Sequence, residues 1–123
     1  MKKIHSEKAP AAVGPYSQAV VINGLVYTSG QIALDPATGA LAGSTIEEQA
    51  EQVMKNLTAI LAQAGTTPEK AVKTLCFLTD IRDFAAFNEV YARYFTEKPA
   101  RSCVQVGALP MGAVCEVEVI AAL

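Results

Sequence analysis

The stretch that decides the fold is SQAVVINGLVYTS, Ser17 to Ser29, in which two apolar runs flank Asn23-Gly24. Both runs, residues 17–22 and 25–29, are rich in the β-branched and aromatic side chains that favour strands. Asn-Gly readily takes the positive φ angles of a two-residue type I′ turn, whose twist matches that of paired strands. The sequence therefore predicts an antiparallel β-hairpin at this position.

An amphipathic helix is predicted after the glycine-rich loop that follows the hairpin. Ser44 and Thr45 begin two overlapping S/T-x-x-E patterns that reach Glu47 and Glu48, and such patterns are typical of a helix start. Apolar residues then recur at steps of three and four until Gly65, which is a helix stop signal. These residues are Ile46, Ala50, Val53, Met54, Leu57, Ile60, Leu61 and Ala64.

The second half of the chain predicts a strand, a helix and two closing strands. The strand is Val72–Leu78, and Asp80 or Asp83 is a candidate cap for the helix. Pro99 ends any continuation of that helix. Its apolar face carries Phe84, Phe87, Val90, Tyr91, Tyr94 and Phe95. The closing strands are PARSCVQV (99–106) and residues 114–121, joined by a turn at 109–112.

This order of elements favours an α+β sandwich, in which both helices cover one face of a mixed, mainly antiparallel sheet. The other face carries mixed polar and apolar side chains, which symmetric association with further copies of the chain commonly covers. A chain of 123 residues with 51% hydrophobic content is long enough for one core. We therefore expect residues 1–123 to form a single domain.

Composition argues against several classes of function. The formal charge of −2 provides no basic field for nucleic acid. We find no apolar signal region and no run of about 18 apolar residues that could span a membrane, so a cytoplasmic location is expected. Cys76, Cys103, Cys115 and a lone surface His5 predict neither a disulfide framework nor a metal site. Motifs for nucleotides, serine hydrolases and zinc proteases are absent.

One charged residue, Arg101, interrupts the apolar strand PARSCVQV. Strand alternation predicts that it lies with Cys103 and Gln105 on the face turned away from the helices, where the next strand supplies Glu116. A guanidinium group matches a carboxylate ligand in a bidentate pair. It equally matches Glu116 or Glu118 in a structural ion pair at an interface between chains. The residues alone leave both interpretations open.

Four other residues are candidates for a site, and each also has a purely structural interpretation. Tyr16, in GPYSQA (14–19), would suit the edge of a sheet, and Gly30, in SGQI (29–32), would suit a kink at a strand end. Asn88 could satisfy a helix end or loop, and Cys103 could be a small buried apolar residue.

Taken together, GPYSQA (14–19), TSGQI (28–32), PARSCVQVGALP (99–110) and CEVEVIA (115–121) resemble the RidA family, also called YjgF/YER057c/UK114, in its archetypal deaminase branch. The resemblance runs nearly end to end. It implies a chorismate-mutase-like fold and a homotrimer with three clefts between neighbouring subunits. It also implies 2-iminobutanoate/2-iminopropanoate deaminase activity, which hydrolyses reactive enamines and imines such as 2-aminoacrylate, released by pyridoxal-phosphate enzymes, to 2-keto acids and ammonia. No metal or cofactor is implied.

By position in these motifs, the resemblance makes Arg101 the clamp for the substrate carboxylate. It makes Glu116 the residue that positions the attacking water and adds Tyr16 to the catalytic residues. The residues that it places in the substrate-binding cleft are Ser29, Gly30, Asn88 and Cys103, the last mainly through its backbone.

The loop before Pro99 is shorter than in many members of the family, and we expect it to affect the substrate range. The alternative function is a non-catalytic trimer that binds small carboxylates or a protein partner in its clefts, as a regulatory or chaperone-like module.

Overall fold

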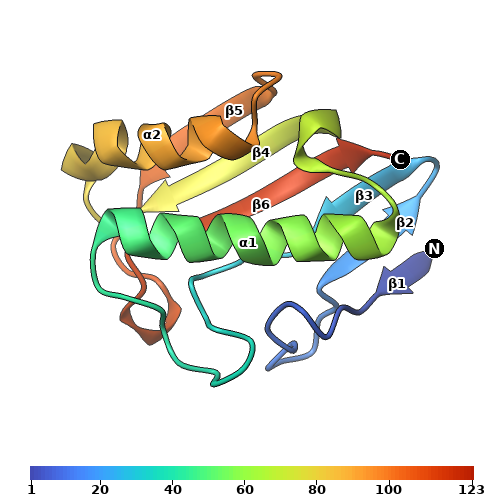
Figure 1. Ribbon diagram of the computed structural model, residues 1–123, viewed down its shortest axis with the longest axis horizontal. Helices are drawn as coiled ribbons and strands as arrows, with labels where there is room; N and C mark the ends of the chain where they lie inside the picture. Colours follow the sequence, from blue (N-terminus) through green and yellow to red (C-terminus); the bar gives the residue numbers. More distant parts are fainter.

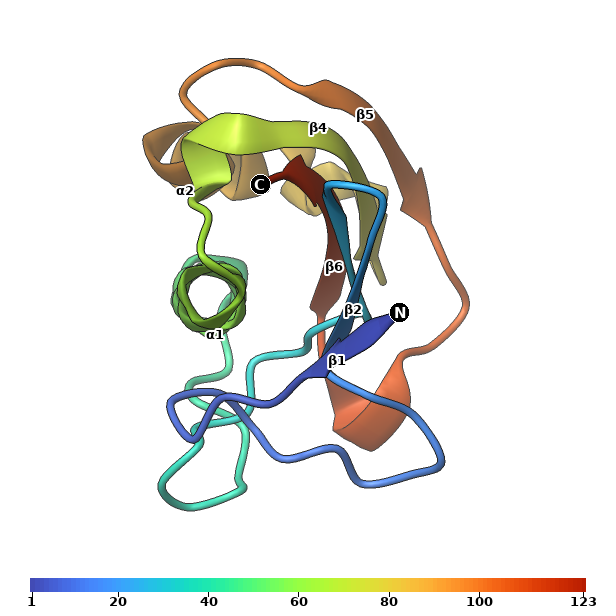
Figure 2. The same cartoon turned by 90° about the vertical axis from the view of Figure 1, so that its right-hand side faces the viewer.

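The computed structural model describes residues 1–123 as one six-stranded sheet with two α-helices on the same side (Figures 1 and 2). The strands are β1 (Lys2–Ile4), β2 (Ala19–Ile22), β3 (Leu25–Thr28), β4 (Ala71–Leu78), β5 (Ala100–Gln105) and β6 (Cys115–Ala122). The helices are α1 (Ile46–Ala64) and α2 (Phe84–Tyr94), with short 3₁₀ turns at Pro68–Lys70, Ile81–Asp83 and Pro110–Gly112. The predicted α+β arrangement is confirmed.

The strand order is β1-β2-β3-β6-β4-β5, and every neighbouring pair is antiparallel except β4 and β5. A parallel pair needs a crossover connection, and α2 provides it between these two strands. The sheet is therefore mixed and mainly antiparallel, as predicted. The short edge strand β1 was not predicted, because three residues are too few for an alternation pattern to be read.

The hairpin is confirmed at the turn that the sequence indicates. Asn23 and Gly24 have φ angles of 51° and 77°, and Ile22 pairs with Leu25 across the turn. The positive φ at both central positions is the requirement of a type I′ turn.

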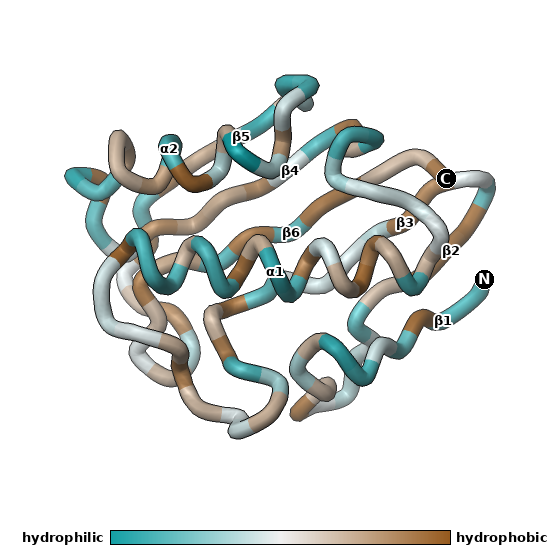
Figure 3. Tube along the Cα trace, viewed as in Figure 1, coloured by the Kyte–Doolittle hydropathy of each residue, from teal (hydrophilic) through white to brown (hydrophobic).

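The first helix also follows the prediction. Thr45 is its N-cap and forms a capping box with Glu48, so the second of the two overlapping patterns is the one that acts. Gly65 ends the helix with a φ of 91°, in the left-handed region. The apolar stripe of α1 is buried against the sheet except for Ala64, which is partly exposed. Figure 3 shows apolar positions recurring along α1 and along the strands behind it.

Helix α2 begins differently from the prediction. Asp80 caps the 3₁₀ turn, accepting a hydrogen bond from the Arg82 backbone N–H, and Asp83 lies at the N-cap of α2 without a capping hydrogen bond. The 3₁₀ turn Ile81–Asp83 continues directly into α2, so the helix begins from an existing turn and needs no side-chain cap. Of the six predicted apolar residues, Phe84 is 39% exposed and Tyr94 is half-buried, whereas the other four are buried.

The predicted facing of Arg101 is wrong. In the register of β4 and β5, Arg101 pairs with Thr74, which is fully buried under α2, so Arg101 faces the helices. Glu116 pairs with Phe77 on the other face, as predicted. Val104 of β5 resembles a core residue in the sequence, but β5 is an edge strand without a buried residue, and Val104 is 47% exposed. Alternation shows which residues share a face, and the position of α2 decides which face that is.

Candidate active site

The predicted site residues fall into two groups on opposite faces of the sheet. Tyr16, Ser29, Gly30 and Glu116 line one cavity of about 390 Å³. Arg101 and Asn88 line another, of about 310 Å³, between α2 and β5. Cys103 follows Arg101 on the same face of β5 and is half-buried. We call the two groups the glutamate half-site and the arginine half-site.

The glutamate half-site depends on a close approach between Gly30 and Glu116. Gln31 forms a two-hydrogen-bond bridge with Val117, and this bridge places the preceding glycine beside the Glu116 side chain. A Cβ atom at residue 30 would lie 2.8 Å from Cδ of Glu116. Glycine at residue 30 therefore leaves the Glu116 carboxyl group room to occupy this position, which a strand-end kink alone does not explain.

The pKa of Glu116 is raised, first because burial disfavours its charged form and second because Glu118 adds a negative charge nearby. No lysine or arginine of the same chain forms an ion pair with it. A half-buried carboxyl group with a raised pKa, at the wall of a cavity, is suited to exchanging a proton with a bound water molecule.

Tyr16 and Ser29 are held by the N-terminal segment. The Tyr16 hydroxyl accepts a hydrogen bond from the Val13 N–H at 3.4 Å, and its side chain is 47% exposed. The Ser29 hydroxyl donates to the Ser17 carbonyl at 2.6 Å. Gln18 is buried, and its side-chain amide donates to the Pro10 carbonyl at 2.7 Å. Sequence reasoning missed Gln18 as a positioning residue, although it lies within GPYSQA.

In the arginine half-site, residues on one face of α2 hold the guanidinium group of Arg101. Nη1 of Arg101 donates to Oδ1 of Asn88 at 2.7 Å. The guanidinium carbon lies 4.7 Å from the ring centroid of Tyr91 and 5.4 Å from that of Phe84. The spacing of these three helix residues, four and then three positions, puts them on one face. Each aromatic contact adds a cation–π attraction to the hydrogen bond.

The Tyr91 side chain is itself held by the sheet, since its hydroxyl group and that of Thr74 on β4 lie 2.7 Å apart in a buried hydrogen bond. Phe84 and Tyr91 were predicted only as apolar residues. Their spacing relative to Asn88 was the available signal for a cradle, but it could be used only once β5 was known to face α2.

Arg101 has no carboxylate partner within the chain. The ion pairs of the structure are His5 with Glu7, Arg82 with Asp80, and Arg93 with Glu51. An intrachain ion pair of Arg101 with Glu116 or Glu118 is ruled out because those side chains lie on the opposite face. Most donors of the guanidinium group are therefore free to bind an incoming carboxylate.

The remaining candidates are placed as follows. Burial raises the pKa of the Cys103 thiol, which keeps it protonated and a weak nucleophile at neutral pH. Cys76 and Cys115 are buried core thiols, as predicted. Lys98, in the short loop before Pro99, has a φ of 53° and lines the arginine half-site, so this loop borders the candidate site.

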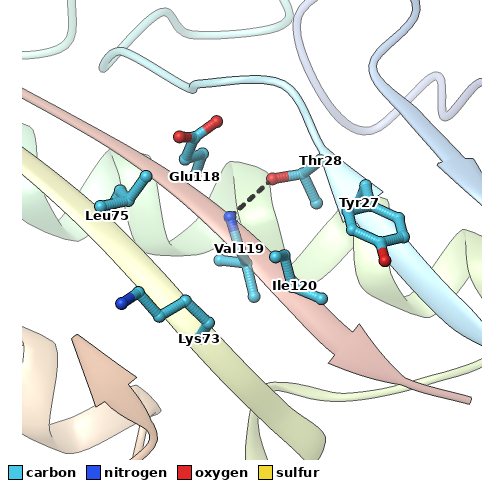
Figure 4. Close-up of a pocket in the computed structure, with 7 residues that line it drawn as sticks. All are labelled: Tyr27, Thr28, Lys73, Leu75, Glu118, Val119 and Ile120. Atoms are coloured by element: carbon cyan, nitrogen blue, oxygen red, sulfur yellow. Dashed lines mark hydrogen bonds between the residues drawn. The ribbon is translucent and has the colours of Figure 1, made fainter. Parts of the chain in front are cut away.

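The face without helices carries a mixture of polar and apolar side chains, as predicted, although Arg101 and Cys103 are not among them. A cavity of about 160 Å³ lies there. Figure 4 shows the residues that line it, which are Tyr27, Thr28, Lys73, Leu75, Glu118, Val119 and Ile120. Two of these residues, Lys73 and Glu118, are charged, and most of the others are apolar. No helix has both the length and the apolar character needed to cross a membrane.

The α+β fold that carries the two half-sites is shared by many solved structures. The chain superposes on RidA from the Antarctic bacterium Psychrobacter sp. PAMC 21119 with a TM-score of 0.96 and 47% identity over 100% of both chains. It superposes on Escherichia coli TdcF, solved with bound serine, with a TM-score of 0.95 and 41% identity, over 100% of this chain and 99% of that one.

Comparison of sequences matches the chain to the same group of proteins. The 2-iminobutanoate/2-iminopropanoate deaminase of Mus musculus is 48% identical over 121 residues, which cover 98% of this chain and 90% of that protein. The sequence model of the family described as Endoribonuclease L-PSP matches residues 6–123. The chain belongs to this family, which is the RidA/YjgF family that its motifs resemble.

Proposed function

We propose that this protein hydrolyses reactive 2-imino acids, such as 2-iminopropanoate and 2-iminobutanoate, to 2-keto acids and ammonia. The observation that carries the proposal is the guanidinium group of Arg101, which is held in place by α2 and lacks a carboxylate partner in its own chain. A relative named as a deaminase of such imines supports it. We place the activity in the cytoplasm, beside the pyridoxal-phosphate enzymes that release the enamines, with residues 1–123 acting as one domain.

The two half-sites support an assembly in which copies of the chain share each site. Arg101 and Glu116 lie on opposite faces of one sheet, so a single chain cannot present both to one small molecule. We propose a homotrimer with three clefts, in which the arginine half-site of one subunit meets the glutamate half-site of its neighbour. The mixed, helix-free face would be covered in the same assembly.

Binding begins with the substrate carboxylate, which the two terminal nitrogens of Arg101 engage in a bidentate pair. Attraction between unit charges about 4 Å apart is on the order of 4 kcal/mol at an intermediate dielectric. The rings of Phe84 and Tyr91 limit the positions available to the guanidinium group. The substrate is thereby fixed with its C2 atom toward the glutamate half-site. TdcF, solved with bound serine, shows that a similar structure accepts a small molecule with a carboxylate.

The chemical step requires one water molecule and proton transfers. An enamine first tautomerises to the imine, whose C2 is electrophilic. Glu116 orients the water and accepts its proton while the oxygen bonds to C2 and the C=N electron pair moves to nitrogen, which takes a proton from solvent. In the resulting tetrahedral carbinolamine, protonated Glu116 returns its proton to the amine; the C–N bond then breaks to release ammonia while the hydroxyl group loses its proton to solvent, which leaves the 2-keto acid and ionised Glu116. One imine and one water thus give one keto acid and one ammonia.

Arg101→Lys tests the clamp, because lysine keeps the charge but lacks the planar fork. A pyridoxal-phosphate dehydratase releases the enamine, and keto acid formation is timed with and without the protein. We expect kcat/KM to fall about 10- to 100-fold, since a charge-assisted hydrogen bond contributes about 1.5–3 kcal/mol. Arg82→Lys is the matched control, because Arg82 is an exposed arginine paired with Asp80.

A parent rate in the Arg101→Lys variant would show that the clamp role is wrong. If the parent protein binds pyruvate but does not accelerate keto acid formation at all, the protein is a non-catalytic carboxylate-binding module. Size-exclusion chromatography with light scattering measures the oligomeric state of each variant, and a monomeric parent would contradict the shared clefts.

A further inference from the structure

The cavity of the glutamate half-site has a second, apolar part. Besides its predicted site residues, it is lined by Val13, Ile32, Leu34, Pro110 and Met111. These come from three separate segments: the N-terminal arm, the loop after Gly30 and the 3₁₀ turn before β6. A cavity with polar groups at one end, among them the Glu116 carboxyl group, and apolar side chains at the other suits a ligand with a reacting polar end and an apolar end.

The wall formed by Ile32 and Leu34 is fixed from inside the protein. Asn56 of α1 is buried, and its Nδ2 donates to the carbonyls of Ile32 and Leu34 at 3.2 Å and 2.9 Å. These hydrogen bonds hold the loop against α1. The wall is thus preformed before any ligand binds.

The opposite wall ends in Met111, which has an unusual backbone. Its φ and ψ are 59° and 20°, in the left-handed region that a non-glycine residue seldom adopts. The turn is closed by hydrogen bonds from the Gly112 N–H to the Leu109 carbonyl and from the Ala113 N–H to the Pro110 carbonyl. Met111 is nevertheless 60% exposed at the cavity. Strain of this kind persists where the surroundings impose it and is frequent at functional sites.

We propose that Met111 is a specificity-determining residue, which selects 2-imino acids with an extended aliphatic side chain over those with a methyl group. The inference rests on the proposed function, because Glu116 is taken to hold the water that attacks C2, and the substituent on C2 then extends into the cavity that Glu116 shares with Met111. The volume of about 390 Å³ is far larger than a methyl group needs, since on the same measure one water molecule takes about 10–15 Å³. A flexible thioether can adapt to side chains of different shape.

The test compares two imines that an amino-acid oxidase generates in situ, 4-methyl-2-iminopentanoate from leucine and 2-iminopropanoate from alanine. Met111→Gln preserves side-chain length but is polar, and Met111→Gly removes the side chain. We expect the parent to favour the leucine-derived imine in kcat/KM and each variant to lose roughly tenfold of this preference, the scale of one methylene contact in an apolar pocket. Ile81→Gln is the control, since Ile81 is 45% exposed and does not line the cavity. An unchanged preference in both Met111 variants would overturn the assignment.

Calorimetric binding of the products separates this inference from the proposed function. If the parent hydrolyses neither imine, but binds 4-methyl-2-oxopentanoate more tightly than pyruvate and Met111→Gln abolishes the difference, the activity is wrong and the role of Met111 holds. If the parent hydrolyses both imines with equal kcat/KM, the activity holds and the role of Met111 is wrong.

Discussion

A methyl group added at Gly30 should disable the proposed site while the fold is kept. The Cβ of Gly30→Ala would lie 2.8 Å from Cδ of Glu116 and closer still to Oε2, whereas ordinary contact begins at 3.4 Å. The carboxyl carbon must therefore move by about 0.6 Å and its oxygen by more. The φ of Gly30 lies outside the left-handed region, so alanine itself is not strained there. Because the carboxyl group ends a flexible side chain, it will swing aside and the backbone will remain in place.

The expected loss follows from that displacement. A shift on the order of 1 Å in a catalytic group lowers the rate about 100-fold, which corresponds to about 2.7 kcal/mol of transition-state stabilisation. We expect kcat to fall by this factor in the dehydratase-coupled assay. KM should change little, because the arginine half-site, which binds the carboxylate, is not touched.

Gly107→Ala is the matched control, since a Cβ at residue 107 would meet no atom within 4 Å. In the Glu116→Gln background, Gly30→Ala should cause no further loss, because both changes act through the same carboxyl group. A Gly30→Ala variant that folds, assembles and turns over at the parent rate would refute the argument. A further loss in the double variant would show that Gly30 acts through another group.

Two other predictions concern charge. Asn88→Asp puts a carboxylate 2.7 Å from the Arg101 guanidinium group, where it competes with the substrate carboxylate. The calorimetric Kd for pyruvate should therefore rise about tenfold or more, and an unchanged Kd would contradict the clamp. If Glu116 acts as the ionised base, kcat/KM falls as the pH drops through its raised pKa. Glu118→Gln removes the negative charge that contributes to this rise, so the acid limb should move to lower pH, and a limb that stays or moves up in an intact assembly would contradict the coupling.

Most candidate site residues could be named from short motifs, but their grouping could not. GPYSQA, TSGQI and PARSCV are contiguous stretches, so the resemblance identifies Tyr16, Gly30 and Arg101 directly. The prediction that Arg101 and Glu116 share a face was wrong because β5 is an exposed edge strand. The aromatic cradle of Arg101 and the apolar cavity of Met111 are formed by residues distant in sequence, so no local pattern reveals them.

The sequence by itself determined the elements whose stabilisation is local. Asn23-Gly24 specifies a turn because few dipeptides tolerate two positive φ angles, and Thr45 with Glu48 specifies the start of α1 through hydrogen bonds within one turn. Only the tertiary structure decided which side of β5 meets α2, because that depends on packing between segments that the sequence does not order in space. It thereby decided that Arg101 and Glu116 belong to separate half-sites.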